Sequence, residues 1–273
     1  MKVITNCKVQ VVGQTIFQEH PVYEVPDDGT DMERLGAFAA KSCYDSYGKD
    51  GRACVENQRE VIAHKHGSVM EHSYASLFLE GITRALTLEL NRHRPFNISQ
   101  RSTRYVEEED SAMVLEPYYA DIWKRHKLGW NEATNRLTSP RDSQYHNPEV
   151  HLVQSFLSQC NIAVHEYLRQ VNLLMELNPN KLEGFALRKW ARGKARNVLP
   201  HALETRGTWT MNMRAWRWFI ELRSNRAAEP EIRRLAEQVL AVLTPLAPVY
   251  FEDFYLTEIV DGIPEWQPKL SKV

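Results

Sequence analysis

Arginine is concentrated in two segments of the chain. Residues 92–104 hold four arginines and a histidine with no acidic residue, and residues 184–226 hold eight arginines and two lysines against two glutamates. The second segment therefore carries an excess charge of +8, although the whole protein has a formal charge of −1. A guanidinium group is a planar fork that binds phosphate or carboxylate through two parallel hydrogen bonds. These residues predict a site for a ligand that carries phosphate.

Two other interpretations of the basic segments remain open. For any single arginine, a solvated surface position is the simpler explanation, because most charged side chains only contact water. Binding of RNA or DNA is the second, since Trp209, Trp216 and Trp218 are interleaved with the arginines and aromatic rings can stack on bases. An isoelectric point of about 6.8 argues against a dedicated nucleic-acid partner. The helical register of Trp216 and Trp218 favours positions in the core or facing a cofactor.

Other common chemistries have little support in the sequence. His64 and His66 lie near Glu71 and His72, but two rings spaced H-x-H at a helix end point to different faces, and we expect no metal site. The chain has no G-x-S-x-G elbow, no Walker A loop and no G-x-G-x-x-G fingerprint. The four cysteines form no C-x-x-C pair, and residues 1–13 have no apolar core of a secretory signal. We expect a cytoplasmic protein with reduced thiols, no metal and no membrane span.

The elements that must position the arginines follow from apolar periodicity. Alternation predicts strands at residues 2–12 and 73–82, a strand before residue 105, and an extended segment at 203–212. Three- and four-residue spacing predicts helices at residues 31–43, 55–66, 83–90, 118–137, 149–177, 182–198, 214–223 and 231–246. We expect Asp31 and Thr83 to cap two of these helices, Gly67 to end the second, and Pro230 to stand at the first position of the last.

These elements predict a helix-rich α+β fold with a small antiparallel sheet. A chain of 273 residues can bury a large core without metal or disulfides. We expect a single domain over residues 1–273, with a helical excursion at residues 118–148 that includes a Ser-, Pro- and Asn-rich loop at 138–148.

A specific motif lies in the first arginine segment. Arg92-His93-Arg94 is followed by seven residues and then Ser102, and the chain continues Thr103-Arg104-Tyr105. This pattern resembles the R-H-R-x7-S signature of the flavin-dependent thymidylate synthases. Further segments resemble the same family in order, and the match spans about residues 35–255: His66-Gly67-Ser68-Val69-Met70-Glu71-His72, Gly81-Ile82-Thr83-Arg84-Ala85, Ala195-Arg196-Asn197-Val198-Leu199-Pro200, Glu204-Thr205-Arg206, Asn212-Met213-Arg214-Ala215-Trp216 and Leu222-Arg223.

The resemblance implies an enzyme with the fold of this family. Such an enzyme methylates dUMP at C5 to give dTMP, taking the carbon from methylenetetrahydrofolate and a hydride from FAD that NADPH has reduced. The family forms homotetramers in which several subunits build each active site. The arginine excess agrees with these ligands, since dUMP, FAD and NADPH all carry phosphate.

The resemblance also implies which residues form the site. Arg223 matches the catalytic arginine that polarises or ionises the uracil. The residues that match dUMP-binding positions are Glu89, Leu90, Asn91, Arg92, Gln100, Arg101, Ser102, Thr103, Arg104, Arg196 and Arg223. The residues that match FAD-binding positions are Ser68, Arg92, His93, Arg94, Gln100, Lys189, Asn212, Met213, Arg214 and Trp218.

The sequence departs from the family at two positions near the implied flavin site. Ala227 stands where the family usually has histidine, and Trp218 stands where asparagine or histidine is common. Two alternatives to thymidylate synthesis therefore stay open. One is a flavin-dependent modification of another pyrimidine nucleotide, and the other is a homologue that binds nucleic acid without catalysis.

Overall fold

The computed structural model describes residues 1–108, 110–138 and 147–273. Within them the chain forms two compact units, and we describe each separately. Unit 1 comprises Met1–Cys7, Glu80–Glu89 and Gln100–Arg206, and unit 2 comprises Lys8–Leu79, Leu90–Ser99 and Gly207–Val273. The expectation of a single domain stays a prediction.

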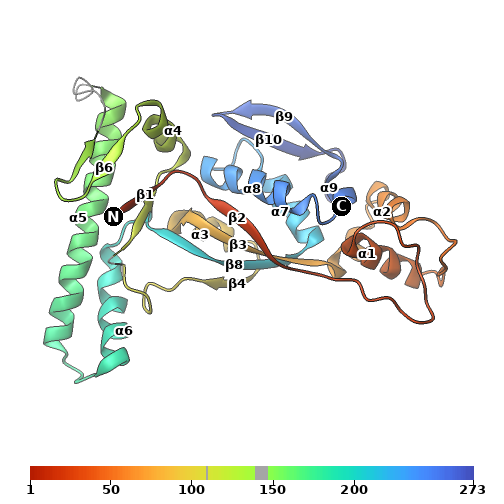
Figure 1. The fold of residues 1–273 in the computed structure, drawn as a ribbon, viewed down its shortest axis with the longest axis horizontal. Helices are drawn as coiled ribbons and strands as arrows, with labels where there is room; N and C mark the ends of the chain where they lie inside the picture. The colour runs from red at the N-terminus through yellow and green to blue at the C-terminus, as the bar shows by residue number, and fades with distance from the viewer. Residues whose placement is uncertain (109, 139–146) are drawn as a thin grey trace. The chain divides into compact units, whose positions relative to one another are not determined.

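The largest sheet has four strands in the order β2-β3-β8-β4. Figure 1 shows its two long central strands, β3 (Tyr74–Thr83) and β8 (Glu204–Asn212), flanked by β2 (Lys8–Gln14) and β4 (Asn97–Gln100). Alternate residues of β3 are fully buried, among them Ala75, Leu77 and Leu79. Strands β3, β4 and β8 confirm the strands predicted at residues 73–82, before 105 and at 203–212. Each central strand continues from one unit into the other.

Unit 2 also contains a set of helices. They are α1 (Asp31–Ser42), α2 (Cys54–Ala63), the 3-10 helix Gly67–His72, α7 (Met213–Arg223), α8 (Pro230–Leu243) and α9 (Pro248–Phe251), followed by the antiparallel hairpin β9 (Phe254–Val260) and β10 (Ile263–Pro268). On α7, Trp216, Phe219 and Ile220 are fully buried, and the Trp216 indole donates to the Ala75 carbonyl at 3.0 Å. The predicted core position of Trp216 is confirmed.

Two details at helix ends in unit 2 differ from the prediction. Thr30, rather than Asp31, caps α1, because its hydroxyl accepts from the Glu33 amide while the Glu33 carboxylate accepts from the Thr30 amide. Gly67 does not end α2. That helix ends at Ala63, Lys65 adopts the left-handed conformation with φ of 57°, and Gly67 begins the following 3-10 helix.

Unit 1 is built around a long helix. Figure 1 shows α5 (Pro148–Leu177) beside α6 (Gly184–Ala195), which continues as the 3-10 helix Arg196–Val198. The unit also holds α4 (Pro117–Arg125), most of α3 (Arg84–Leu90), the parallel pair β1 (Lys2–Ile4) and β5 (Ala112–Val114), and the hairpin β6 (Gly129–Asn131) and β7 (Arg136–Thr138). Val153, Leu157 and Val164 of α5 pack into its apolar core.

Two predictions in unit 1 are wrong in part. The helix expected at residues 118–137 ends at Arg125, since the chain then forms the β6–β7 hairpin, in which Leu137 is buried against α5. The strand expected at residues 2–12 is split into β1 and β2, with residues 5–7 between them outside either strand. The predicted loop at residues 138–148 lies mostly outside the described residues, because positions 139–146 are not among them.

None of the described helices is long and apolar enough to cross a membrane. No three His, Cys, Asp or Glu side chains of residues 1–108, 110–138 and 147–273 gather as metal ligands would. Cys7, Cys43, Cys54 and Cys160 are not joined in disulfides.

Candidate functional site

The residues implied by the motifs fall into two groups, one in each unit. The R-H-R part of the signature follows the end of α3 and belongs to unit 2, together with Asn212, Arg214 and Arg223. The part from Gln100 to Arg104 belongs to unit 1, together with Lys189 and Arg196. Asn212 and Arg214 line a pocket of unit 2, and Thr103 and Arg196 line a pocket of unit 1.

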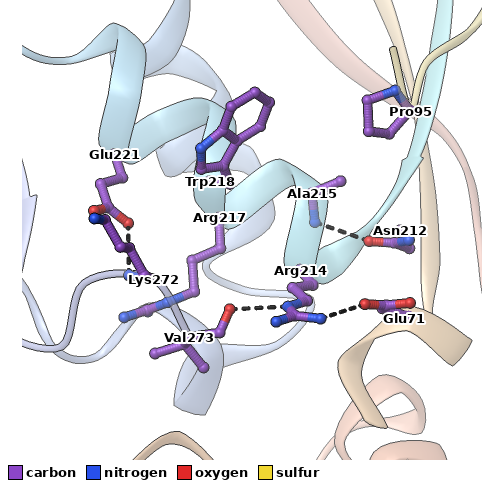
Figure 2. Close-up of a pocket in the computed structure, with 10 residues that line it drawn as sticks. All are labelled: Glu71, Pro95, Asn212, Arg214, Ala215, Arg217, Trp218, Glu221, Lys272 and Val273. Atoms are coloured by element: carbon purple, nitrogen blue, oxygen red, sulfur yellow. Dashed lines mark hydrogen bonds and ion pairs between the residues drawn. The ribbon is translucent and has the colours of Figure 1, made fainter. Parts of the chain in front are cut away.

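The pocket of unit 2, here called the α7 pocket, has a volume of about 530 Å³. It is lined by Glu71, Pro95, Asn212, Arg214, Ala215, Arg217, Trp218, Glu221, Lys272 and Val273, which Figure 2 shows around the first turns of α7. Asn212 caps this helix, with its side-chain oxygen accepting from the Ala215 amide at 2.8 Å. The Trp218 indole is 44% exposed and offers a flat apolar surface at the pocket.

Arg214 is the central cation of the α7 pocket. Its Nη1 donates to the Glu71 carboxylate at 2.5 Å and its Nε donates to the Val273 main-chain oxygen at 2.9 Å, as the dashed lines of Figure 2 indicate. Gly67 makes this approach possible, since a Cβ there would lie 2.6 Å from the Val273 carbonyl carbon. The side chain implied to contact flavin is therefore held in place by residues of its own unit.

His93 and Arg223 are joined by a hydrogen bond. The Nε of Arg223 donates to Nε2 of His93 at 2.9 Å, although the two residues are 130 positions apart. His93 is only 3% exposed. Burial, and then the nearby Arg223 cation, lower the pKa of His93 from 6.5 to about 4. The imidazole is therefore neutral at physiological pH and acts as the acceptor in this bond.

The pocket of unit 1, here called the Arg84 pocket, has a volume of about 360 Å³. It is lined by Arg84, Thr87, Leu88, Thr103, Arg196, Asn197, Leu199, Pro200, His201 and Leu203. Arg196 points its Nη1 toward the Thr103 hydroxyl, 3.5 Å away. Burial lowers the pKa of Arg84, and repulsion from Arg196 and Arg101 acts in the same direction while Glu108 opposes it. Two cations that repel each other at one pocket are stabilised by a bound anion.

Two neighbours of the Arg84 pocket are held by contacts within unit 1. Arg101 binds the fully buried Glu108 through two contacts of 2.8 Å from its Nη1. Burial raises the pKa of Glu108, and Arg101 opposes that shift. The amide of Gln100 donates to the hydroxyls of Thr205 at 3.2 Å and Thr87 at 3.4 Å. Gln100 therefore contacts a lining residue of the pocket without itself lining it.

Two further implied residues of unit 1 lie along α6. Arg104 passes beside Gly193, where a Cβ would lie 3.5 Å from the Arg104 Nε. Lys189 lies 4.9 Å from the centre of the Tyr105 ring, in a cation–π geometry. Ser102 accepts from the Arg104 amide at 3.3 Å.

The other implied residues of unit 2 differ in exposure. Leu90 and Met213 are fully buried. Asn91 accepts from the Trp209 indole at 3.2 Å. Asn91 is exposed, as are Ser68, Arg92 and Arg94, and Glu89 of unit 1 is half-buried.

Part of the arginine excess is structural. Arg217 is buried and paired with Asp253, Arg192 pairs with Glu107, and Arg226 pairs with Glu258. These acids lie outside the basic segments, so counting charges within the segments alone overestimates the cations available to a ligand. Among the described residues, Arg84 and Arg196 form no contact-distance ion pair with a carboxylate, in contrast to Arg101.

Arg84 and His201 are two lining residues of the Arg84 pocket to which motif matching assigned no site role. Arg84 lies in Gly81-Ile82-Thr83-Arg84-Ala85, a segment that already resembled the family, so a signal for it was present. His201 lies in the turn before β8, and nothing in its spacing distinguished it from a loop residue.

Comparison with known proteins decides the family. Residues 26–249 match the family model described as thymidylate synthase complementing protein. A flavin-dependent thymidylate synthase of Mycobacteroides abscessus is 36% identical over 266 residues, which cover 96% of this chain and 95% of that protein. One of Mycobacterium tuberculosis is 35% identical over 258 residues, covering 93% of this chain and 92% of that protein.

The chain belongs to the flavin-dependent thymidylate synthase family. The family consists of enzymes, and the resemblance of the motifs is thereby confirmed. The fold agrees. The structure of PolB, a UMP/dUMP methylase from Streptomyces cacaoi bound with 5-Br dUMP, aligns with a TM-score of 0.63 at 21% identity, covering 92% of this chain and 96% of that one. The same methylase bound with 5-Br UMP aligns with a TM-score of 0.62 at 20% identity, covering 92% and 95%.

Trp218 and Ala227, the two departures from the family pattern, lie in different environments. Trp218 lines the α7 pocket and meets the His93 ring edge-on, with centroids 5.0 Å apart. Ala227 is exposed and its amide donates to the Asn225 side chain at 2.9 Å. Its neighbour Arg226 is paired with Glu258 at 2.7 Å.

Proposed function

We propose that this protein catalyses the reductive methylation of dUMP to dTMP, with methylenetetrahydrofolate as carbon donor and FAD, reduced by NADPH, as hydride donor. The observation that carries the proposal is the Arg84 pocket. Two arginines, Arg84 and Arg196, line a pocket whose charge an anion would balance, and Arg196 and Thr103 belong to motifs of the family. A nucleotide monophosphate supplies such an anion.

Unit 1 supplies the residues for the phosphate. Arg84 and Arg196 contribute two positive charges, and the Thr103 hydroxyl lies 3.5 Å from the Arg196 Nη1. Arg101 is engaged by Glu108, so in this proposal it stabilises the pocket wall, while Ser102 and Arg104 extend the binding surface. A hydrogen bond from a charged donor contributes about 1.5–3 kcal/mol, so two arginines are enough to select a phosphorylated nucleotide over a nucleoside.

The residues of the α7 pocket fit a flavin. The half-exposed indole of Trp218 matches a flat ring system, Lys272 and the Glu71-paired Arg214 line the pocket, and a volume of about 530 Å³ is in the range of cofactor sites. His93 presents a second indication, because its buried Nδ1 has no hydrogen-bond partner in the described chain. When bound, FAD supplies the hydride that this chemistry requires.

Arg223 is the catalytic residue in this proposal. A fixed guanidinium stabilises negative charge that develops on the uracil ring, so that C5 becomes nucleophilic toward the one-carbon unit. Such stabilisation is far larger in a site that excludes water than the ~1 kcal/mol typical of bulk water. No cysteine nucleophile is needed, which agrees with burial raising the pKa of the Cys54 and Cys160 thiols to about 11.

We also propose how the protein assembles and in which compartment it acts. The exposed apolar side chains Ile162, Leu173, Leu177 and Phe185 on α5 and α6 support the homotetramer with shared active sites that the family resemblance implies. A single functional domain over residues 1–273 and a cytoplasmic setting complete the proposal.

Product analysis tests the proposed reaction. The purified protein is incubated with FAD, NADPH, methylenetetrahydrofolate and dUMP, and the nucleotides are separated and weighed by mass spectrometry. We expect dTMP, dependent on all four additions. A product whose mass exceeds that of dUMP by anything other than one CH2 unit, the net gain when methyl replaces the C5 hydrogen, would contradict the proposal.

UMP is a second candidate substrate, because the aligned structure is that of a UMP/dUMP methylase. The same assay with UMP distinguishes the two. Methylation of UMP with higher kcat/KM than dUMP would replace thymidylate synthesis by modification of a ribonucleotide.

A further inference from the structure

We propose that His93 is a positioning residue, whose neutral imidazole orients the guanidinium of Arg223 for the nucleotide. The inference rests on the proposed function for what Arg223 does. It assigns the histidine of the R-H-R motif a role toward the catalytic arginine, in addition to the flavin contact that the family resemblance implies.

The hydrogen bond between the two side chains fixes one edge of the guanidinium. Arg223 ends α7, and its Nε lies 2.9 Å from the His93 Nε2. The guanidinium is planar, so one hydrogen bond at Nε restricts rotation about the last side-chain torsion and thereby sets the direction of the two terminal nitrogens.

The imidazole can serve as a fixed support because aromatic rings enclose it. Trp218, Phe219 and Phe96 meet its ring at centroid distances of 5.0, 5.2 and 6.0 Å, all with steep interplanar angles. Phe219 is fully buried and Phe96 is nearly so. Three rings packed around one imidazole leave it a single orientation.

A histidine suits this task better than an acid. A carboxylate at the same place would orient Arg223 but would also neutralise its charge, whereas a neutral imidazole accepts the hydrogen bond and leaves the cation in place for a developing anion. Burial and then the Arg223 cation lower the pKa of His93, so the acceptor in this hydrogen bond is the neutral imidazole.

The tautomer that follows gives His93 a second polar group, a buried donor. Because Nε2 accepts from Arg223, the ring proton lies on Nδ1, and this buried N–H has no acceptor among the described residues. An acceptor atom of a bound ligand would satisfy it. His93 would then join ligand binding to the orientation of Arg223.

The matched variants are His93→Leu and His93→Gln. The glutamine amide can place an acceptor near the position of Nε2, whereas leucine keeps similar volume and accepts nothing. We expect His93→Leu to lower kcat by about 10–100-fold at saturating flavin, with a smaller change in the KM for dUMP, and His93→Gln to recover most of the loss. Equal kcat values for both variants would overturn the inference.

A chemical rescue experiment isolates the contact. Added guanidinium ion is expected to restore part of the turnover of Arg223→Ala, because His93 still offers its acceptor to the ion. In the double variant Arg223→Ala/His93→Leu, the rescue should be at least tenfold weaker at the same guanidinium concentration. Equal rescue in both backgrounds would show that His93 does not orient the cation.

A measurement without turnover separates this inference from the proposed function. In protein labelled with ¹⁵N-arginine, the Nε–H signal of Arg223, assigned by its loss in Arg223→Lys, should be protected from exchange in the wild type and His93→Gln but not in His93→Leu. Protection that is unchanged in His93→Leu would overturn the inference even if dTMP is formed. Protection as expected in a wild type that forms no dTMP would contradict the proposed function alone.

Discussion

Arg217 and Asp253 form a buried, two-pronged ion pair. Nη1 and Nη2 of the arginine lie 2.6 and 2.7 Å from the two carboxylate oxygens, and the Arg217 side chain is only 2% exposed. The same guanidinium donates to the carbonyl oxygens of Tyr250 and Leu270 and lies 4.8 Å from the Phe254 ring centre. Arg217 of α7 therefore connects this helix to the chain around Tyr250–Asp253 and to Leu270 near the end of the chain.

Arg217→Ala is expected to destabilise the protein by about 3–5 kcal/mol. The substitution leaves the mostly buried Asp253 carboxylate without its cation and removes two further hydrogen bonds. Denaturant unfolding followed by far-ultraviolet circular dichroism measures the change.

The control is Arg226→Ala, which breaks the exposed ion pair between Arg226 and Glu258. It should cost less than about 1 kcal/mol. Equal losses for the two variants would mean that burial of Arg217 does not decide its contribution.

His93 should make stability fall as the pH is lowered from neutral. Its pKa is lowered from 6.5 to about 4 in the folded protein. Between these values the unfolded chain binds a proton that the folded protein does not, so acid favours unfolding. The loss of unfolding free energy that His93 causes approaches about 3 kcal/mol at pH 4 and is absent above pH 7.

The measurement is the unfolding free energy of wild type minus that of His93→Gln between pH 7 and pH 4. This difference should decrease with acid by about 3 kcal/mol. A difference that is constant over the range would indicate an unshifted His93.

Arg84→Gln and Arg196→Gln should each weaken nucleotide binding by about 10–100-fold, because each removes a charged donor to the phosphate. Calorimetry with dUMP gives the affinity. Deoxyuridine, which lacks the phosphate, should be affected far less by the same substitutions.

Arg188→Gln is the matched control, since Arg188 is an exposed arginine of α6 outside both pockets. It should bind dUMP as the wild type does. If all three variants bind alike, the Arg84 pocket is not the phosphate site.

Arg223→Ala should lower kcat by about 100–1,000-fold, because it removes the cation that stabilises charge on the uracil. Flavin content and oligomeric state should remain those of the wild type. Steady-state kinetics give kcat, the visible spectrum of the purified variant gives its flavin content, and size-exclusion chromatography gives its oligomeric state. Turnover near the native rate would show that Arg223 is not a catalytic residue.

Most elements of the fold could be predicted because their apolar periodicity is strong. The long helix α5 and strands β3 and β8 lie within a residue or two of the predicted ranges. The β6–β7 hairpin could not be predicted from residues 118–137, since Trp130 and Leu137 also fit a helical spacing and only packing against α5 selects the hairpin. Strand β1 separates from β2 because it pairs with β5, a long-range contact that local sequence does not contain.

The site could be predicted as far as motifs reach. The R-H-R-x7-S signature located His93, and the Leu222-Arg223 segment located Arg223. No sequence rule pairs residues that lie 130 positions apart. Likewise, charge counting could not separate Arg217, whose partner Asp253 lies far along the chain, from Arg84 and Arg196, which face a pocket.

The most direct test of the central claim is the visible spectrum of the purified protein during reduction. NADPH is added without oxygen to the protein loaded with FAD, and flavin bleaching is followed with and without dUMP. The account predicts a spectrum of bound flavin that bleaches faster when dUMP is present. A protein that retains no flavin after unbound FAD is removed would contradict the account. Flavin bleaching at the same rate with and without dUMP would also contradict it.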